Sequence, residues 1–320
     1  MSNLQNGTLC ILGCGKCATL HRANSHSRRN TGNLGIAILN GLINAPTEKS
    51  SELPFTQYIA CVRSEISEKR LTERFAQSMS KLRISRGDNV KAVQNANVII
   101  LGADPADIET VLTQPGLREA LADKLLISIA AGWTRQKLES TIYGSATTAE
   151  NTSGCTWVVR TLPNIAAQVS QSLTAIEISE PALPERYLQI TTSIFEQIGK
   201  AVHIDPKLMN ATTAVGGSTP AFFAVIVDAM IDAAVAVGVP RDLAHTMIFQ
   251  SMQGTASMLQ SGIHPALLKD QGTSPEGCTI GGLMVMEEAG VRGHVGRALR
   301  EAVTLARLME TTDHVNDTRH

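Results

Sequence analysis

Three glycines near the start of the chain have the spacing of a phosphate-binding turn. An apolar run at residues 9–12 leads into Gly13 and Gly15, and Gly35 lies near the start of a second apolar stretch, NLGIAILNGL at residues 33–42. In a G-x-G-x-x-G fingerprint the glycines permit a tight turn, close approach of a pyrophosphate, and packing of a helix on a strand. The pattern predicts a dinucleotide site with the turn residues Gly13, Gly15, Asn33, Leu34 and Gly35. A glycine-rich loop without a ligand is the alternative.

The fingerprint is interrupted by residues 16–32, which are rich in His, Arg, Ser and Asn. This segment has no helical or strand period, so it predicts an inserted loop. Removing it joins Gly15 to Asn33 and restores a continuous fingerprint. Two origins remain open, a natural insertion and a translated intron, because a splice donor can be encoded at residues 15–17 and an acceptor at residues 31–32. We favour the intron, since its removal restores the motif in frame.

The same region contains a pattern that imitates a metal site, formed by Cys14, Cys17, His21 and His26. Zinc fingers place about twelve residues between their Cys and His pairs. Here three residues separate Cys17 from His21. We therefore expect no metal, and zinc or redox use is the less favoured alternative.

Arg63 and Ser64 follow the second apolar run, at residues 58–62. An acidic residue at this position would hydrogen bond the ribose 2′-hydroxyl of NAD, whereas an arginine accommodates the 2′-phosphate of NADP. Glu65 stands one position too late for the first role. Arg63 with Ser64 thus favours NADPH, and a solvated charged loop is the alternative.

A second candidate site lies near the other end of the chain, where Ser274-Pro275-Glu276-Gly277 leads into a helical pattern at Thr279. Free N–H groups and the positive end of the helix dipole make such a junction an anion site. The Thr279 hydroxyl can donate or accept a hydrogen bond. The alternative is a helix cap in which Ser274 or Thr279 satisfies the free N–H groups.

The elements that must position these residues alternate between apolar strands and helices over residues 1–205. Such alternation predicts an α/β fold with a doubly wound parallel sheet of the Rossmann type. Strands are expected at residues 9–12, 58–62, 98–101, 125–129, 156–160, 173–178 and 201–204, and helices at residues 34–44, 65–80, 106–112, 117–122, 134–138 and 184–198.

Strand patterns end after Asp205, and an all-α region follows. Its helices are expected at residues 206–237, 240–261, 279–289 and 294–310. We predict two domains, an NAD(P)-binding domain at 1–205 that includes the inserted loop 16–32, and a helical domain at 206–320. The apolar stretch 221–237 is short for a membrane span and carries Asp228 and Asp232, which favours a buried or subunit-interface helix.

The composition excludes several classes of protein. A hydrophobic content of 43% and a formal charge of −1 give no electrostatic reason to expect a nucleic-acid or membrane-surface partner. The six cysteines show no disulfide framework, which fits a reducing, cytoplasmic compartment. The N-terminal residues carry no pattern of a secretory signal.

Several longer motifs occur together in one order. They are HPALLKDQGTSPEGCTIGGLMVMEE at residues 264–288, VRTLPNIAAQVSQSLTAI at 159–176, the turn Ala130-Ala131-Gly132, AVGGSTPAFFAVIVD at 214–228, and Gly238-Val239-Pro240-Arg241. Together they resemble the pyrroline-5-carboxylate reductase family over essentially the whole chain except residues 16–32 and the last few residues.

This resemblance implies reduction of the C=N bond of 1-pyrroline-5-carboxylate to L-proline, the last step of proline biosynthesis. It implies NAD(P)H as the cofactor, of which Arg63 and Ser64 favour NADPH while NADH stays possible, and a helical domain that forms a homodimer or larger homo-oligomer. It places the substrate carboxylate at Ser274 and Gly277 and the ring nitrogen at the catalytic Thr279. It places the nicotinamide at Ala130, Gly132, Pro163 and Asn164.

The chain departs from the family pattern at one further position, since Asp104 precedes Pro105 where a basic residue is usual. Besides an active reductase, two other interpretations remain. One is a folded, non-catalytic product of a retained intron with a disrupted cofactor loop, and the other is another imine or β-hydroxyacid reductase. No histidine is expected to act as a general acid, because a cyclic imine can take its proton from solvent.

Overall fold

A computed structural model describes residues 6–14, 34–45, 53–145, 154–178 and 182–311 of the chain. The inserted loop 16–32, and with it Cys17, His21 and His26, lies outside these residues. Gly15 and Asn33 also lie outside them. The predictions made for these positions, including the origin of the insert, therefore stay predictions.

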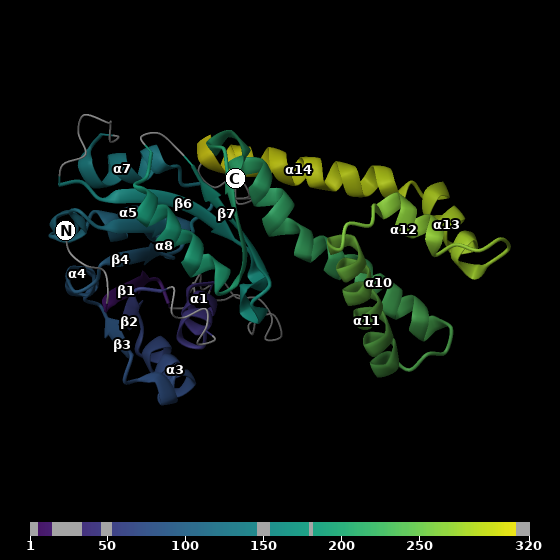
Figure 1. Cartoon of the computed structure of the whole chain (residues 1–320), viewed down its shortest axis with the longest axis horizontal. Coiled ribbons are helices and arrows are strands. Elements are labelled where there is room, and N and C mark those ends of the chain that lie inside the picture. Colours follow the sequence, from purple (N-terminus) through teal and green to yellow (C-terminus); the bar gives the residue numbers. More distant parts are fainter. Residues whose placement is uncertain (1–5, 15–33, 46–52, 146–153, 179–181, 312–320) are drawn as a thin grey trace, which may run out of the picture. The chain divides into compact units, whose positions relative to one another are not determined.

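Eight strands of the described chain form one sheet in the order β3-β2-β1-β4-β5-β6-β7-β8 (Figure 1). All neighbouring pairs are parallel except the antiparallel pair β6–β7. The order reverses at β1, which lies between β2 and β4, as in doubly wound sheets. The predicted fold class is thus confirmed. The strands are β1 (Gly7–Leu12), β2 (Phe55–Val62), β3 (Leu82–Arg86), β4 (Val98–Leu101), β5 (Leu125–Ser128), β6 (Trp157–Pro163), β7 (Ser172–Glu177) and β8 (Gly199–Ile204).

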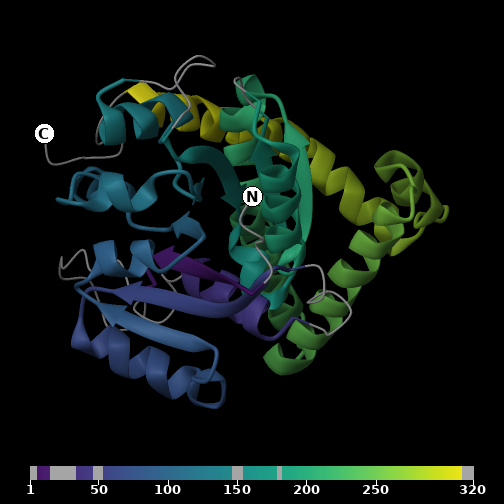
Figure 2. The same cartoon turned by 60° about the vertical axis from the view of Figure 1, so that its left-hand side comes forward.

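Helices cover both faces of the sheet (Figure 2), and the alternation of side chains along β1 shows why. Leu9 and Ile11 belong to one apolar cluster with α1 and α8, whereas Cys10 and Leu12 belong to a second cluster with α4 to α7. A strand buried on both faces is apolar at every position, as this sequence is. The helices are α1 (Leu34–Ile43), α3 (Glu65–Arg74), α4 (Asn89–Gln94), α5 (Ile108–Leu112), α6 (Leu117–Leu121), α7 (Arg135–Tyr143) and α8 (Glu185–Glu196).

The sequence patterns missed the short elements β3, α4 and α12 (Pro265–Gln271) and misjudged the bounds of some helices. The helix expected at residues 134–138 continues to Tyr143. The helix expected at residues 65–80 ends at Arg74 and is followed by a 3₁₀ turn, Ala76–Ser78. The edge strand β3 has the sequence LRISR and only its first residue is buried. A polar edge strand carries almost no apolar alternation, so its pattern is weak.

The chain beyond β8 is helical, as predicted. A π-helical segment, Thr213–Ser218, separates a short helix from α10. The helices are α9 (Met209–Thr212), α10 (Thr219–Ala236), α11 (Arg241–Gln260), α12 (Pro265–Gln271), α13 (Cys278–Glu288) and α14 (Val291–Thr311).

The chain divides into two compact units, one containing Met1–Gly217 with Leu305–His320 and the other containing Ser218–Thr304. These units do not follow the predicted boundary between 205 and 206, because residues 206–217 and the end of α14 pack with the first unit.

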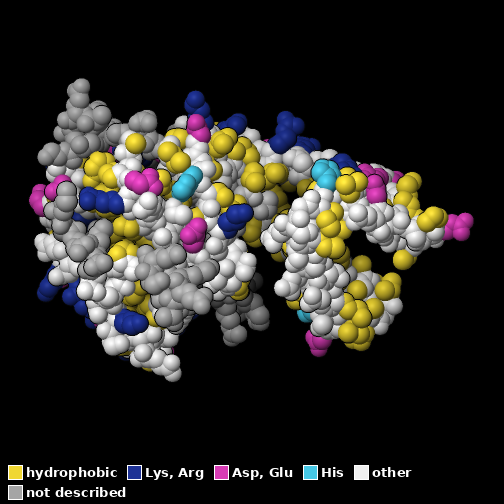
Figure 3. Space-filling view, in the orientation of Figure 1, with side chains coloured by type: hydrophobic (Ala, Val, Ile, Leu, Met, Phe, Trp, Pro, Cys, Tyr) yellow, Lys and Arg dark blue, Asp and Glu magenta, His cyan; other side chains and the backbone are white. Residues whose placement is uncertain are grey.

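The second unit, Ser218–Thr304, buries very few of its apolar residues. Ile231 and Ala244 are its only buried residues, whereas Val225 is 71% exposed and Met284 is 64% exposed. Figure 3 shows hydrophobic side chains at the surface of this unit. One helical stretch, Pro206–Ala236, is long and apolar enough to cross a membrane by length and composition alone. Within this chain, the stretch predicted to be a buried or interface helix is thus mostly uncovered.

Candidate functional site

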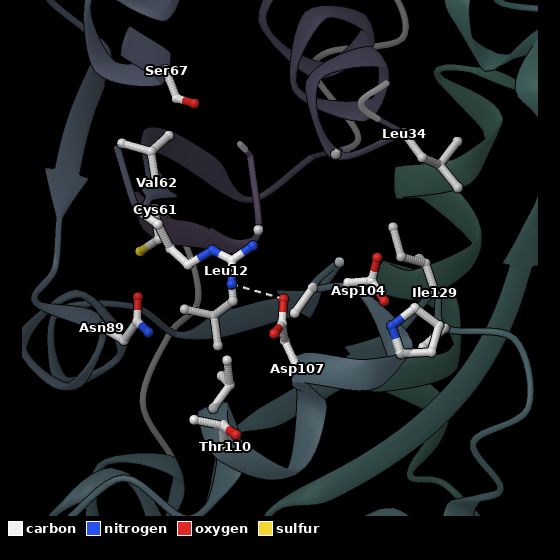
Figure 4. Close-up of a pocket in the computed structure, with 18 of the residues that line it drawn as sticks. Leu12, Leu34, Cys61, Val62, Ser67, Asn89, Asp104, Asp107, Thr110 and Ile129 are labelled. Carbon is white, nitrogen blue, oxygen red and sulfur yellow. Dashed lines mark ion pairs between the residues drawn. The ribbon is translucent and has the colours of Figure 1, made fainter. Parts of the chain in front are cut away.

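A cleft of about 750 Å³ lies within the first unit, at the carboxyl ends of β1, β2, β4 and β5. This edge, where the strand order reverses, is where open α/β sheets bind ligands. Figure 4 shows the side chains that line it. The lining includes the predicted cofactor residues Gly13, Leu34, Gly35, Arg63, Ser64 and Ala130.

The two described halves of the glycine fingerprint meet in this cleft. Gly13 adopts a left-handed φ of +100°, and a Cβ there would overlap the carbonyl of Gly102. A Cβ on Gly35 would lie 3.4 Å from the carbonyl oxygen of Gly13 and 3.3 Å from Ile11. Gly13 therefore requires a residue without a side chain, whereas at Gly35 a side chain would be tightly packed and the glycine allows close packing of the helix on the strand, as the fingerprint expects. The helix that begins at Leu34 presents its N-terminus to the cleft.

Cys14 serves packing at this turn. Its N–H donates to the carbonyl of Cys61 at 2.9 Å, and its side chain is fully buried. Burial raises the pKa of the Cys14 thiol well above its ordinary value, which opposes thiolate chemistry. Among the described residues no cluster of three or more His, Cys, Asp and Glu side chains is arranged to hold a metal ion.

Arg63 reaches across the cleft to a residue that the sequence analysis did not identify. Its Nη1 lies 2.8 Å from Oδ2 of Asp107, the last residue of the 3₁₀ turn Pro105–Asp107 that follows β4 (Figure 4). Ser64 caps α3, where its Oγ accepts the N–H of Ser67 at 3.2 Å. The sequence did contain a signal for Asp107. The pattern Asp-Pro-Ala-Asp places two acidic residues shortly after β4, a strand that pairs with β1.

The expected nicotinamide residues are only partly brought together. Ala130 lines the cleft, and its N–H donates to Oγ of Ser128 at 3.3 Å. Gly132 has φ +75° and lies against the end of α14, where a Cβ would be 2.9 Å from the carbonyl oxygen of Met309. Gly132 thus permits close packing of two segments, and it is not among the residues that line the cleft.

Pro163 and Asn164 lie at the end of β6 and are also not part of the cleft lining. Asn164 Nδ2 donates to the carbonyl of Gly216 at 2.8 Å, while its Oδ1 accepts the N–H of Ala166 at 3.1 Å. These two bonds fix Asn164 between the sheet and the π-helical segment. In the described chain its contacts are structural, and a role toward the nicotinamide stays a prediction.

A buried ion cluster lies on the same strand and escaped the sequence analysis. Arg160 is 3% exposed, and its Nη1 lies 2.8 Å from Oε1 of Glu310 and 3.7 Å from Oε2 of Glu177. Asn210 Nδ2 donates to Glu310 at 2.8 Å. Because a charge buried without a partner is costly, this cluster holds the end of α14 in the first unit.

The expected substrate loop lies in the second unit. Gly277 is the N-cap of α13, and its N–H donates to the carbonyl of Ser274 at 3.1 Å. Thr279 stands in the first turn of α13, and its side chain, like that of Ser274, is exposed. A Cβ on Gly277 would lie 2.5 Å from Ser274 Oγ, so a larger residue would displace the Ser274 hydroxyl from its place in the turn. The junction therefore has the form of an anion site.

Comparisons with known proteins identify relatives along the whole chain. Residues 206–309 match a family model described as pyrroline-5-carboxylate reductase dimerisation, and residues 30–132 match one described as NADP oxidoreductase, coenzyme F420-dependent. Pyrroline-5-carboxylate reductase from Lophium arboricola is 41% identical over 98% of this chain and 96% of its own length. The Neurospora crassa enzyme of the same name is 36% identical over the same shares.

Solved structures give the same fold. A crystal structure of pyrroline carboxylate reductase from Plasmodium falciparum, with NADP bound, matches with a TM-score of 0.73. The match covers 97% of this chain and 100% of that one at 21% identity. At this level of identity the likeness establishes the fold alone.

Proposed function

This chain belongs to the pyrroline-5-carboxylate reductase family, and we propose that it reduces 1-pyrroline-5-carboxylate to L-proline with NADPH as the preferred cofactor. The enzyme would be an oxidoreductase acting on a CH–NH group in proline biosynthesis. The observation that carries the proposal is the meeting of Gly13 and Gly35 in a cleft at the reversal point of the sheet. The similarity of the whole chain to reductases of this name favours this substrate over other imines and hydroxy acids.

The residues of the cleft fit a dinucleotide. Gly13 and Gly35 leave room for the pyrophosphate beside the N-terminus of α1, and Arg63 supplies a cation for a 2′-phosphate. Ala130 lies at the end of the cleft formed by β5. When bound, NADPH supplies the hydride for the reaction. We keep Gly15 and Asn33 as proposed cofactor residues from the glycine fingerprint, and Gly132, Pro163 and Asn164 from the resemblance.

The substrate chemistry needs orientation more than strong acids or bases. The ring nitrogen takes a proton from solvent, a hydride adds to C5, and the electron pair of the C=N π bond passes to nitrogen. We propose that Ser274, Gly277 and the N–H groups of the first turn of α13 bind the carboxylate. The Thr279 hydroxyl then meets the ring nitrogen.

The second unit is proposed to pair with another copy of the chain, as a homodimer or part of a larger homo-oligomer. Its exposed apolar helices support this, together with the match of residues 206–309 to a dimerisation model. Asp228 and Asp232 on α10 oppose a lipid environment, and Asp232 pairs with Arg241 at 2.8 Å. We propose a cytoplasmic enzyme, because the described cysteines are free thiols, and no nucleic-acid or membrane partner.

Steady-state assays test this function. We expect the purified chain to oxidise NADPH with pyrroline-5-carboxylate far faster than with other cyclic imines or β-hydroxy acids. A higher kcat/KM for one of those other substrates would show that the proposed substrate is wrong. The proposal that the cleft binds NADPH would still stand. A chain that binds NADPH poorly and turns over no imine would favour the non-catalytic interpretation, in which the cofactor loop is disrupted.

A further inference from the structure

The cleft combines one cation with carboxylates, and this balance bears on which cofactor the enzyme accepts. Among the described residues that line the cleft, Arg63 is the only Lys, Arg or His, whereas both Asp104 and Asp107 line it. Arg63 forms an ion pair of 2.8 Å with Asp107. A residue expected to bind a 2′-phosphate is therefore already engaged by an anion of the chain itself.

The backbone that carries Asp107 is held in place by its turn. Asp104 Oδ1 accepts the N–H of Ala106 at 3.0 Å, and the N–H of Asp107 donates to the carbonyl of Asp104 at 2.8 Å. Pro105 fixes the backbone between them. Because the turn is stabilised locally, moving the Asp107 carboxylate away from Arg63 requires a side-chain rotation or disruption of the turn.

We propose that Asp107 is a specificity-determining residue that weakens the preference of this enzyme for NADPH over NADH. This inference rests on the proposed function, because it concerns the cofactor of that reaction. A 2′-phosphate that binds Arg63 must share the guanidinium with Asp107, which places two anions at one cation. A 2′-hydroxyl adds no charge and can donate a hydrogen bond to a carboxylate, as in NAD-binding sites.

The size of the effect follows from the exposure of the pair. The side chain of Arg63 is 66% exposed and that of Asp107 is 37% exposed, so solvent screens their interaction. Competition between a phosphate and a carboxylate for one guanidinium in such a setting changes affinity by roughly tenfold. The enzyme is therefore expected to use both cofactors, with the ratio set by the charge at position 107.

The test is equilibrium binding of NADPH and NADH to Asp107→Asn, with 2′,5′-ADP and 5′-AMP as fragments that lack the nicotinamide. We expect NADPH and 2′,5′-ADP to bind roughly tenfold tighter than to the unaltered enzyme, while NADH and 5′-AMP stay equal or bind up to about threefold weaker. Asp107→Glu keeps the charge and should keep the original ratio. Arg63→Ala should remove most of the response to Asp107→Asn.

Glu68→Gln is the matched control. It breaks the ion pair between Arg86 and Glu68, whose charged atoms lie 2.7 Å apart. The Glu68 side chain is 34% exposed, which is similar to Asp107, and neither Arg86 nor Glu68 lines the cleft. This variant should leave both affinities unchanged. The proposal is overturned if Asp107→Asn changes NADPH and NADH affinity equally or changes neither. Failure of turnover with pyrroline-5-carboxylate would overturn the proposed function and would leave this binding ratio as a separate result.

Discussion

The two compact units of this chain differ in how far they bury their apolar residues. In the first unit, both faces of the sheet are covered by continuous apolar clusters, and strands such as β4 are buried at every position. In the second unit, α13 has the sequence CTIGGLMVMEE and no buried residue. The first unit thus carries its own core, whereas the second has apolar helices with little to cover them inside this chain.

From this difference we infer that the cofactor half of the proposed active site depends on the fold of one chain, whereas the substrate half depends on the assembly. The cofactor cleft lies entirely within the first unit, so its shape is supported by a packed core. The expected substrate loop precedes α13, a helix with no residue buried within this chain. We infer that NADPH binding needs only the fold of one chain, and that catalysis needs the assembly.

The largest expected effect comes from breaking the assembly. Phe223 and Phe249, on α10 and α11, are 51% and 53% exposed in the chain. Replacing both with Glu would bury two charges in an apolar interface, so turnover should fall by roughly a thousandfold as the protein becomes monomeric. NADPH affinity should stay within about threefold of the original value.

Sedimentation velocity and NADPH titration measure the two outcomes on the same protein. Gln250→Glu, on the same helix as Phe249, adds one charge at an exposed polar position and serves as the control. A double variant that stays assembled, or one that loses NADPH binding along with turnover, would remove the contrast between the units.

Thr279→Ala should have the next largest effect, because it removes a hydroxyl proposed to meet the ring nitrogen. We expect kcat to fall by about a hundredfold, as for other single donors in active sites. NADPH affinity should not change, since Thr279 lies in the second unit. Thr279→Ser should recover most of the rate, and unchanged kinetics in the Ala variant would exclude Thr279 from the site.

Glu310→Gln tests the buried cluster that holds the end of α14 in the first unit. Among the residues that the structure describes, this change leaves Arg160, which is 3% exposed, with the more distant Glu177 as its counter-charge. The free energy of unfolding should fall by about 2 kcal/mol, measured by urea denaturation. Glu287→Gln breaks an exposed pair with Arg292 of 2.6 Å and should have no measurable effect. Equal stability of the two variants would contradict the importance of the cluster.

Deleting residues 16–32 should have the smallest effect of the series. The deletion joins Gly15 to Asn33 and makes the fingerprint continuous beside Gly13 and Gly35, which already meet in the cleft. We expect NADPH to bind roughly tenfold tighter, because a shorter connection between Gly15 and Gly35 costs less entropy to close. Equal affinity of the full chain and the deletion variant would mean that the insert leaves the turn intact. Transcript sequencing tests the intron hypothesis independently.

The sequence predicted local features of the fold better than distant contacts. The contact of Gly13 with Gly35 was predictable, because the fingerprint specifies it through backbone constraints alone. The strand β3 was missed, since an edge strand reading LRISR has little apolar pattern. The pairs Arg63–Asp107 and Arg160–Glu310 join residues far apart in the chain. The periodicity of apolar residues along the sequence does not predict such contacts. Gly132 was expected at the nicotinamide, but its φ and its contact with Met309 account for the glycine by packing.

The most direct test of the central claim is the stoichiometry of proline formation by the purified full chain. NADPH oxidation is followed by absorbance and L-proline by amino-acid analysis, with pyrroline-5-carboxylate as the substrate. The account predicts one L-proline for each NADPH oxidised, with turnover that is lost in the Phe223→Glu, Phe249→Glu variant. An assembled protein that binds NADPH and forms no proline would contradict it.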